Sequence, residues 1–176
     1  MYGGISLIGW FHTIIGTAGI LTGIYLLIRH SFIDMKSNLG MFYIICTIFT
    51  SGSSFFIFSA NGSFNDAHLL SLLTILAIIT ALILDRFNFF SFLTKYLKEL
   101  ALSVTVLFSM MPTTAEVLQR LPPNDPFVDS IYDPLIMNFY MSYALIYVIF
   151  AMYQIFLING GSYNEKWQLW EGRSKI

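Results

Sequence analysis

The sequence predicts an all-α, polytopic membrane protein, a helical bundle with five transmembrane helices. Of its 176 residues, 56% are apolar and 11% are charged, whereas soluble globular domains carry about 25% charged residues. The apolar residues gather in five stretches, each close to the roughly 20 residues that a helix needs to cross the hydrocarbon core. Composition therefore identifies the lipid bilayer as the first partner of this chain.

The first three stretches are residues 5–28, 39–60 and 67–84. The first has no basic residue before it and no small-residue cleavage site after it, so we expect a retained helix and not a signal peptide. A short polar segment separates it from the second stretch. A turn of Asn, Gly, Ser and Asp over residues 61–66 separates the second from the third and supplies helix-capping side chains.

The last two stretches are residues 100–118 and 134–158. A charged loop, residues 85–95, precedes the fourth. Three prolines between 121 and 126 end it, because proline lacks the N–H group that a continuing helix needs. Asp133 followed by Pro134 is typical of an N-cap and first helical residue. Residues 1–158 thus form one transmembrane bundle, and the tail 159–176, with Trp167 and Trp170, is expected at the membrane interface.

Basic residues indicate the orientation, because cytoplasmic loops retain Lys and Arg. Five crossings place eight of the nine basic residues on the side opposite the N-terminus. These eight are Arg29, Lys36, Arg86, Lys95, Lys98, Lys166, Arg173 and Lys175. Only Arg120 lies on the side of the N-terminus. We therefore expect a multi-pass protein of the cell inner membrane with its N-terminus outside and its C-terminus in the cytoplasm.

Polar and small residues follow one face of each expected helix. In the first helix His12, Gly16, Gly19 and Gly23 share a face, and small residues at that spacing let two helices approach closely. The other faces comprise Thr47, Ser51 and Ser54; Thr105, Ser109, Pro112, Thr113, Glu116 and Arg120; and Tyr140, Tyr143, Tyr147 and Gln154. Since polar groups inside a membrane are costly, we expect these faces to meet in the bundle interior.

The expected topology brings several of these residues to the outer end of the bundle. His12 lies near the start of the first helix and His68 near the start of the third. Glu116 and Arg120 end the fourth helix, with Thr113 one turn before them. Asp66 and Asp133 lie at helix starts on the same side. The sequence therefore predicts a pocket of histidine, glutamate and arginine side chains in the outer leaflet.

Three interpretations of this pocket stay open. His12 and His68 could ligate a b-type haem or a divalent metal ion through neutral imidazole. Glu116 could relay protons or bind a cation in a small proton- or ion-coupled carrier, or it could form a structural pair with Arg120 at i, i+4. Alternatively, the protein is a non-catalytic accessory subunit that packs against other membrane-protein subunits. For Asp66 the simplest interpretation is an N-cap.

Other residues give weaker signals. Met110 and Met111 fit soft metal ligation, but methionine is also an ordinary core filler, which we favour. Cys46 is a lone cysteine in an apolar stretch and cannot form an intrachain disulfide. A net charge of −1 gives no basic surface for nucleic acid. The sequence contains no GxGxxG, Walker, nucleophile-elbow or HExxH motif, so we expect a binding protein and not an enzyme.

Three segments carry a family resemblance. They are Phe11-His12-Thr13-Ile14-Ile15-Gly16-Thr17-Ala18-Gly19, Asn61-Gly62-Ser63-Phe64-Asn65-Asp66-Ala67-His68-Leu69-Leu70 and Thr113-Thr114-Ala115-Glu116-Val117-Leu118-Gln119-Arg120-Leu121-Pro122. With them the chain resembles a family of small bacterial inner-membrane proteins known as a domain of unknown function. Members often have a histidine and arginines where this chain has Lys36-Ser37-Asn38. The resemblance implies a membrane bundle with functional weight on His12, His68, Glu116 and Arg120, and it implies no activity.

Overall fold

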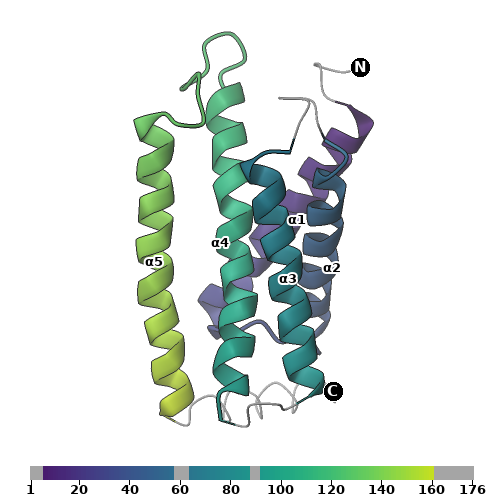
Figure 1. Cartoon of the computed structure of the whole chain (residues 1–176), viewed down its shortest axis with the longest axis vertical. Coiled ribbons are helices and arrows are strands. Elements are labelled where there is room, and N and C mark those ends of the chain that lie inside the picture. The colour runs from purple at the N-terminus through teal and green to yellow at the C-terminus, as the bar shows by residue number, and fades with distance from the viewer. Residues whose placement is uncertain (1–5, 58–63, 88–91, 161–176) are drawn as a thin grey trace.

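The computed structural model describes residues 6–57, 64–87 and 92–160. Within these ranges the chain forms five helices, and successive helices run in opposite directions (Figure 1). They are α1 (Leu7–His30), α2 (Asn38–Ser54), α3 (Asp66–Arg86), α4 (Thr94–Arg120) and α5 (Pro134–Asn159). The all-α prediction is confirmed. Four of the helices, α1, α3, α4 and α5, are long and apolar enough to cross a membrane, whereas α2 has 17 residues.

Four helices enclose the main apolar core. α1 packs against α2, α2 against α3, α3 against α4, and α4 returns to α1. Between them lie Leu26, Tyr43, Ile78, Leu102 and Val106, all at most 5% exposed. α5 packs against α4 and stands at the edge of the bundle (Figure 1).

The glycines of α1 form a close helix contact, as their spacing predicts, and the partner is α2. A Cβ atom at Gly23 would lie 2.6 Å from the Tyr43 ring, one at Gly19 would lie 3.2 Å from Cys46 Cβ, and one at Gly16 would lie 3.0 Å from Thr50 Cγ2. Real Cβ atoms essentially never approach within 3.0 Å of another heavy atom. The two backbones can therefore lie this close only because these positions lack side chains.

Two helices have other bounds than the sequence suggests. α2 ends at Ser54, and residues 58–60 of the expected helix lie outside the described residues. Near this end Ser53 and Ser54 donate hydrogen bonds to the carbonyls of Thr50 and Ser51, a local pattern that competes with helix continuation. α4 begins at Thr94, six residues before the expected Leu100, because Lys, Leu and Glu are good helix formers.

The connection between α1 and α2, which the sequence suggests is a polar loop, has three buried apolar side chains. Phe32, Ile33 and Met35 are at most 7% exposed, and Ile33 and Met35 belong to the main core. Ser31 caps α1 in the left-handed conformation, with φ of 69°, and this turns the chain back under the bundle. The connection therefore closes one end of the apolar core.

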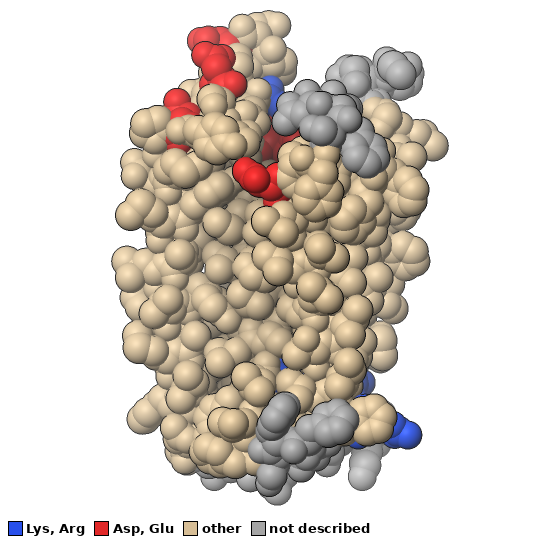
Figure 2. Space-filling model, viewed as in Figure 1, with Lys and Arg blue, Asp and Glu red and all other residues tan. Residues whose placement is uncertain are grey.

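The two ends of the bundle differ in charge. We call the end where α1 and α3 finish and α4 begins the basic end, which carries Arg29, Lys36, Arg86, Lys95 and Lys98. The opposite, acidic end carries Asp66, Glu116, Asp125, Asp129 and Asp133, together with Arg120. Figure 2 shows uncharged side chains over the whole middle of one face, between acidic groups at the top and basic groups at the bottom. Beyond Gly160 the expected interfacial tail lies outside the described residues.

Candidate functional site

His12 lies on the glycine face of α1, at its acidic end, and points toward α2. Its Nδ1 atom lies 3.0 Å from the Ser53 hydroxyl, which itself donates to the Thr50 carbonyl at 2.9 Å. Where Ser53 gives its one hydroxyl proton to the Thr50 carbonyl, the matching tautomer of His12 donates from Nδ1. Neutral His12 therefore carries its free lone pair on Nε2. Nearby, the buried Oγ1 atom of Thr50 has no hydrogen-bond partner in the part of the chain that is described.

His68 lies in the first turn of α3 and takes part in its cap. Asn65 is the N-cap: its side chain accepts from the backbone N–H groups of Ala67 and His68. The His68 Nδ1 atom lies 2.8 Å from Asn65 Oδ1 and 3.2 Å from Asn65 N. The ring stacks on Phe64 and is 2% exposed. As acceptor of the Asn65 N–H, Nδ1 of a neutral His68 leaves the ring proton on Nε2, whereas donation from Nδ1 to Asn65 Oδ1 requires the other tautomer.

Glu116 and Arg120 form an ion pair one helical turn apart on α4, between Oε2 and Nε. Both side chains are about half exposed, at 58% and 51%. The Glu116 carboxylate also lies within electrostatic reach of His12. An exposed pair of this kind stabilises a helix end by only a few tenths of a kcal/mol, so it can open to a ligand at little cost.

The other residues of the predicted pocket cap their helices or bond within them. Asp66 is the first residue of α3, where its charge interacts favourably with the helix dipole, while Asn65 provides the cap that the sequence suggested for Asp66. Thr113 is exposed, and its hydroxyl donates to the Ser109 carbonyl in its own helix. Asp133 is the N-cap of α5 and accepts from Leu135 N at 2.8 Å.

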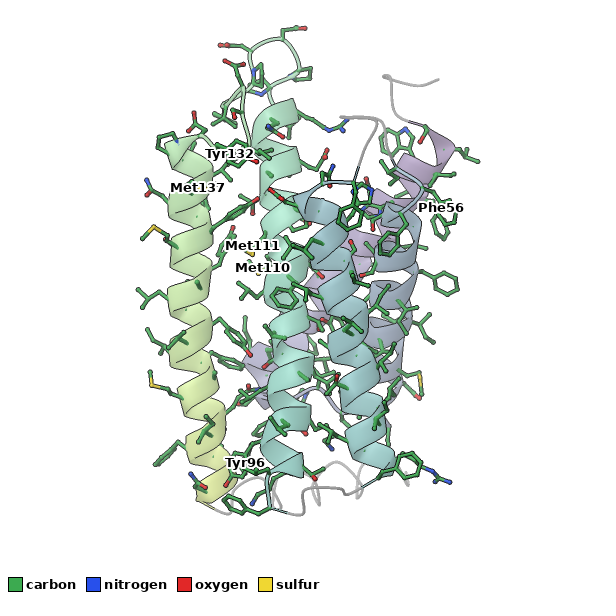
Figure 3. The ribbon with its side chains drawn as sticks, in the orientation of Figure 1. Phe56, Tyr96, Met110, Met111, Tyr132 and Met137 are labelled. Atoms are coloured by element: carbon green, nitrogen blue, oxygen red, sulfur yellow. The ribbon has the colours of Figure 1, made fainter. Side chains whose placement is uncertain are left out.

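The structure brings both histidines to the end of α2. His12 meets Ser53, and the His68 ring lies 6.1 Å from that of Phe55. Within residues 6–57, 64–87 and 92–160, no group of three or more His, Cys, Asp or Glu residues could hold a metal ion. Methionines do not add ligands here: Met110 packs against the main core, and Figure 3 shows Met110 and Met111 midway along the bundle.

The predicted polar face of α5 fastens this helix to its neighbours. The Tyr143 hydroxyl lies 2.9 Å from Thr114 Oγ1, and the Tyr147 hydroxyl donates to the Leu100 carbonyl. Gln154 is fully buried: it accepts from Ser103 at 2.9 Å and donates to the Ser31 carbonyl at 2.6 Å. These side chains serve packing, which is the ordinary role of a tyrosine stripe.

A second polar cluster, which the sequence analysis missed, lies at the basic end. Glu99 is 1% exposed in the second turn of α4. Lys98 Nζ lies 3.4 Å from Glu99 Oε1 and 3.1 Å from Asp85 Oδ1. A buried glutamate in a membrane helix is a strong functional signal. Continuing the fourth apolar stretch back through Thr94 would have revealed it, because Glu99 then shares a face with buried Leu102, Ser103 and Val106.

Asp34, in the connection between α1 and α2, belongs to the same neighbourhood. Its Oδ1 atom accepts from Lys36 N at 2.8 Å, and its carboxylate interacts electrostatically with Lys98, Lys36 and Asp85. Burial raises the pKa of Asp34 above its ordinary value, and this effect exceeds the opposite effects of the hydrogen bond from Lys36 and of the lysine charges. We call Asp34, Asp85, Lys98 and Glu99 the Lys98 cluster.

An apolar layer separates the two polar ends. The buried side chains of Leu26, Ile78, Leu102 and Val106 belong to it. Within this layer the Tyr43 hydroxyl lies 2.6 Å from Thr105 Oγ1. The Thr105 hydroxyl in turn donates to the Leu102 carbonyl at 2.6 Å. This arrangement weighs against a continuous route for protons or ions in the conformation observed.

Comparisons of the chain with protein-family models, with curated proteins and with solved structures give no match.

Proposed function

We propose that this chain is a five-span inner-membrane protein, with its N-terminus outside and its basic end in the cytoplasm, that binds a ligand at its acidic end through His12. The crowding of Lys and Arg at one end supports the orientation. The fifth span would be α2, whose 17 residues are at the short end of the range that crosses a bilayer. The family resemblance places weight on the same end.

One observation carries the ligand-binding proposal: the hydrogen bond between His12 Nδ1 and Ser53. Imidazoles that bind metal usually donate their other ring N–H to a fixed acceptor, which sets the tautomer and the ring orientation. Ser53 provides such an acceptor and leaves Nε2 as the binding atom. The Thr50 hydroxyl, which has no hydrogen-bond partner among the described residues, adds a second polar atom that a ligand or water could use.

The sharpest form of the proposal is a b-type haem held by His12 and His68. Nδ1 of each ring lies in a hydrogen bond, with Ser53 and with Asn65, and His68 presents a lone pair on Nε2 in the tautomer that donates from Nδ1 to Asn65 Oδ1. Haem iron can be held by two axial side chains, whereas a zinc site needs at least three protein ligands. Since the described residues add no third His, Cys, Asp or Glu to the two histidines, we favour haem over a divalent metal ion.

An absorption spectrum of the purified protein tests this form. We expect a Soret band that His12→Ala and His68→Ala each remove or shift. His30→Ala is the matched control, because His30 lies at the opposite end, beside Tyr25, and should leave the band unchanged. A colourless protein that stays colourless after haem supplementation and contains no metal by elemental analysis would rule out haem and metal binding.

The carrier function, which would use Glu116, is the weaker candidate. Glu116 is half exposed and paired with Arg120, and the apolar layer separates it from the basic end.

A role as an accessory subunit has one observation in its favour. Of the other helices, α5 packs substantially only against α4, and Met141, Leu145, Ile149, Met152 and Phe156 leave its outer face at least 56% exposed. Purification in mild detergent tests this role: a stoichiometric second membrane protein that is lost when Leu145 and Ile149 become alanine would support it, and a monodisperse single chain would oppose it.

A further inference from the structure

Three basic side chains at the basic end have no carboxylate in contact among the described residues. Arg29 lies in the last turn of α1, Arg86 in the last turn of α3, and Lys95 in the first turn of α4. The ion pairs found at this end lie within the Lys98 cluster and include none of the three. We call Arg29, Arg86 and Lys95 the cationic rim. The part of the chain that the structure describes thus leaves these charges available to a partner from outside the protein.

The cationic rim borders the apolar surface of the bundle. Ile28 precedes the arginine of α1 and Phe87 follows the arginine of α3, and both side chains are more than half exposed. The Lys95 ammonium lies 5.6 Å from the centroid of the exposed Phe92 ring. In a bilayer such apolar side chains face the hydrocarbon, and Arg and Lys beside them extend to the level of the phosphates. Figure 2 shows this border, where the charged groups visible at the lower end are basic.

The two ends of the bundle act differently on an anionic headgroup. Among the described residues, the acidic end has five acidic side chains and one basic side chain, Arg120, which pairs with Glu116. The basic end has five Lys and Arg side chains against three carboxylates, those of Asp34, Asp85 and Glu99. A headgroup with net negative charge is therefore attracted at one end and repelled at the other. Phosphatidylcholine has no net charge, so it gains little from either end.

We propose that the cationic rim binds anionic phospholipids, which are thereby enriched around the basic end of the bundle. The guanidinium groups of Arg29 and Arg86 can each donate two parallel hydrogen bonds to phosphate oxygens, and Lys95 adds a point charge. The acyl chains of the same lipids cover the exposed apolar side chains next to the rim. This inference rests on the membrane span proposed above, holds for either orientation, and is independent of any ligand at His12.

Electron paramagnetic resonance of spin-labelled lipids tests the proposal. The protein is reconstituted in phosphatidylcholine vesicles that contain a trace of phosphatidylglycerol or phosphatidylcholine labelled on an acyl chain. The fraction of label whose motion the protein restricts gives the relative association constant of each lipid. We expect phosphatidylglycerol to associate more strongly with the wild-type protein, and each charge removed from the rim to weaken its binding there about 5-fold. Arg29→Gln/Arg86→Gln/Lys95→Gln should bring its association close to that of phosphatidylcholine.

Arg120→Gln is the matched control, because it removes one cation from the opposite end. It should keep the preference for phosphatidylglycerol. High salt, about 1 M NaCl, should weaken the preference of the wild-type protein, because it shortens the range of electrostatic attraction to about 3 Å.

A double variant keeps the test decisive if the triple variant fails to fold. Arg29→Gln/Arg86→Gln changes two exposed side chains and should remove most of the preference. Equal association of the two lipids with the wild-type protein would overturn the proposal, as would a preference that the double variant retains in full. Vesicles in which the protein restricts neither lipid would contradict the membrane span as well, whereas the Soret band reports separately on His12.

Discussion

The close approach of α1 and α2 makes Gly23→Ala a sharp test of the fold. A Cβ atom at this position would lie 2.6 Å from Tyr43 Cε2 and 2.9 Å from Val106 Cγ2. Both neighbours are buried, at 1% and 5% exposure, so neither can move without disturbing the main core. Gly52→Ala in α2 is the matched control, because a Cβ atom there meets nothing within 4 Å.

Two opposing effects determine how much Gly23→Ala changes the unfolding free energy. Alanine is favoured over glycine inside a helix by about 1 kcal/mol, and both variants gain this. Overpacking a close-packed core costs about 1–3 kcal/mol, and only Gly23→Ala suffers it. The difference between the two variants therefore isolates the steric cost, about 1–3 kcal/mol, or about 5- to 150-fold in the unfolding equilibrium constant.

Reversible unfolding by SDS in mixed micelles, followed by circular dichroism, measures this difference. Gly19→Ala and Gly16→Ala should fall between the two, since their neighbours lie at 3.2 Å and 3.0 Å and the Thr50 side chain that faces Gly16 can rotate. Equal unfolding free energies for Gly23→Ala and Gly52→Ala would refute the close contact of α1 with α2.

Three further changes give separate outcomes. Gln154→Met removes two buried hydrogen bonds and should lower the unfolding free energy by about 1–3 kcal/mol, whereas exposed Asn138→Ala on the same helix should change it little in the same SDS titration. Asp34→Asn tests the raised pKa of that carboxyl: the folded state binds the proton more tightly, so wild-type unfolding free energy falls as pH rises from the ordinary aspartate value through the raised one. The asparagine variant keeps an acceptor for Lys36 N and should lack this fall, and an unchanged pH profile would contradict the assignment. Gly40→Ala should prevent folding, seen as loss of a monodisperse peak in size-exclusion chromatography, because its Cβ atom would lie 1.8 Å from the Asp34 carbonyl oxygen.

The sequence predicts the helices well because apolar length and glycine spacing are local properties. The face with Gly16, Gly19 and Gly23 could be identified from the sequence of α1 alone, and it packs closely on another helix, which is α2. The same helical phase predicts that His12 points toward protein. Its partner, Ser53 of α2, could not be predicted, because hydrophobic periodicity does not specify which helix, or which of its residues, faces a given position.

The candidate site was predicted only in part. Placing His12, His68 and Glu116 at one end required only the direction of each helix. The capping role of His68 depends on the conformation of Asn65, and the exposure of Glu116 depends on how α4 packs against the other helices. Neither property is encoded in the spacing of polar residues.

Glu99 shows why a hydropathy window overlooks buried charge. The window ends where charged residues begin, on the assumption that charges at a helix end are solvated. Here the connection between α1 and α2 packs on the first turns of α4: Ile33 and Met35 lie in the core cluster of Leu102, and Phe32 lies with Tyr96. A segment that looks like a polar loop in sequence thus creates the enclosure in which Lys98 and Glu99 are removed from water.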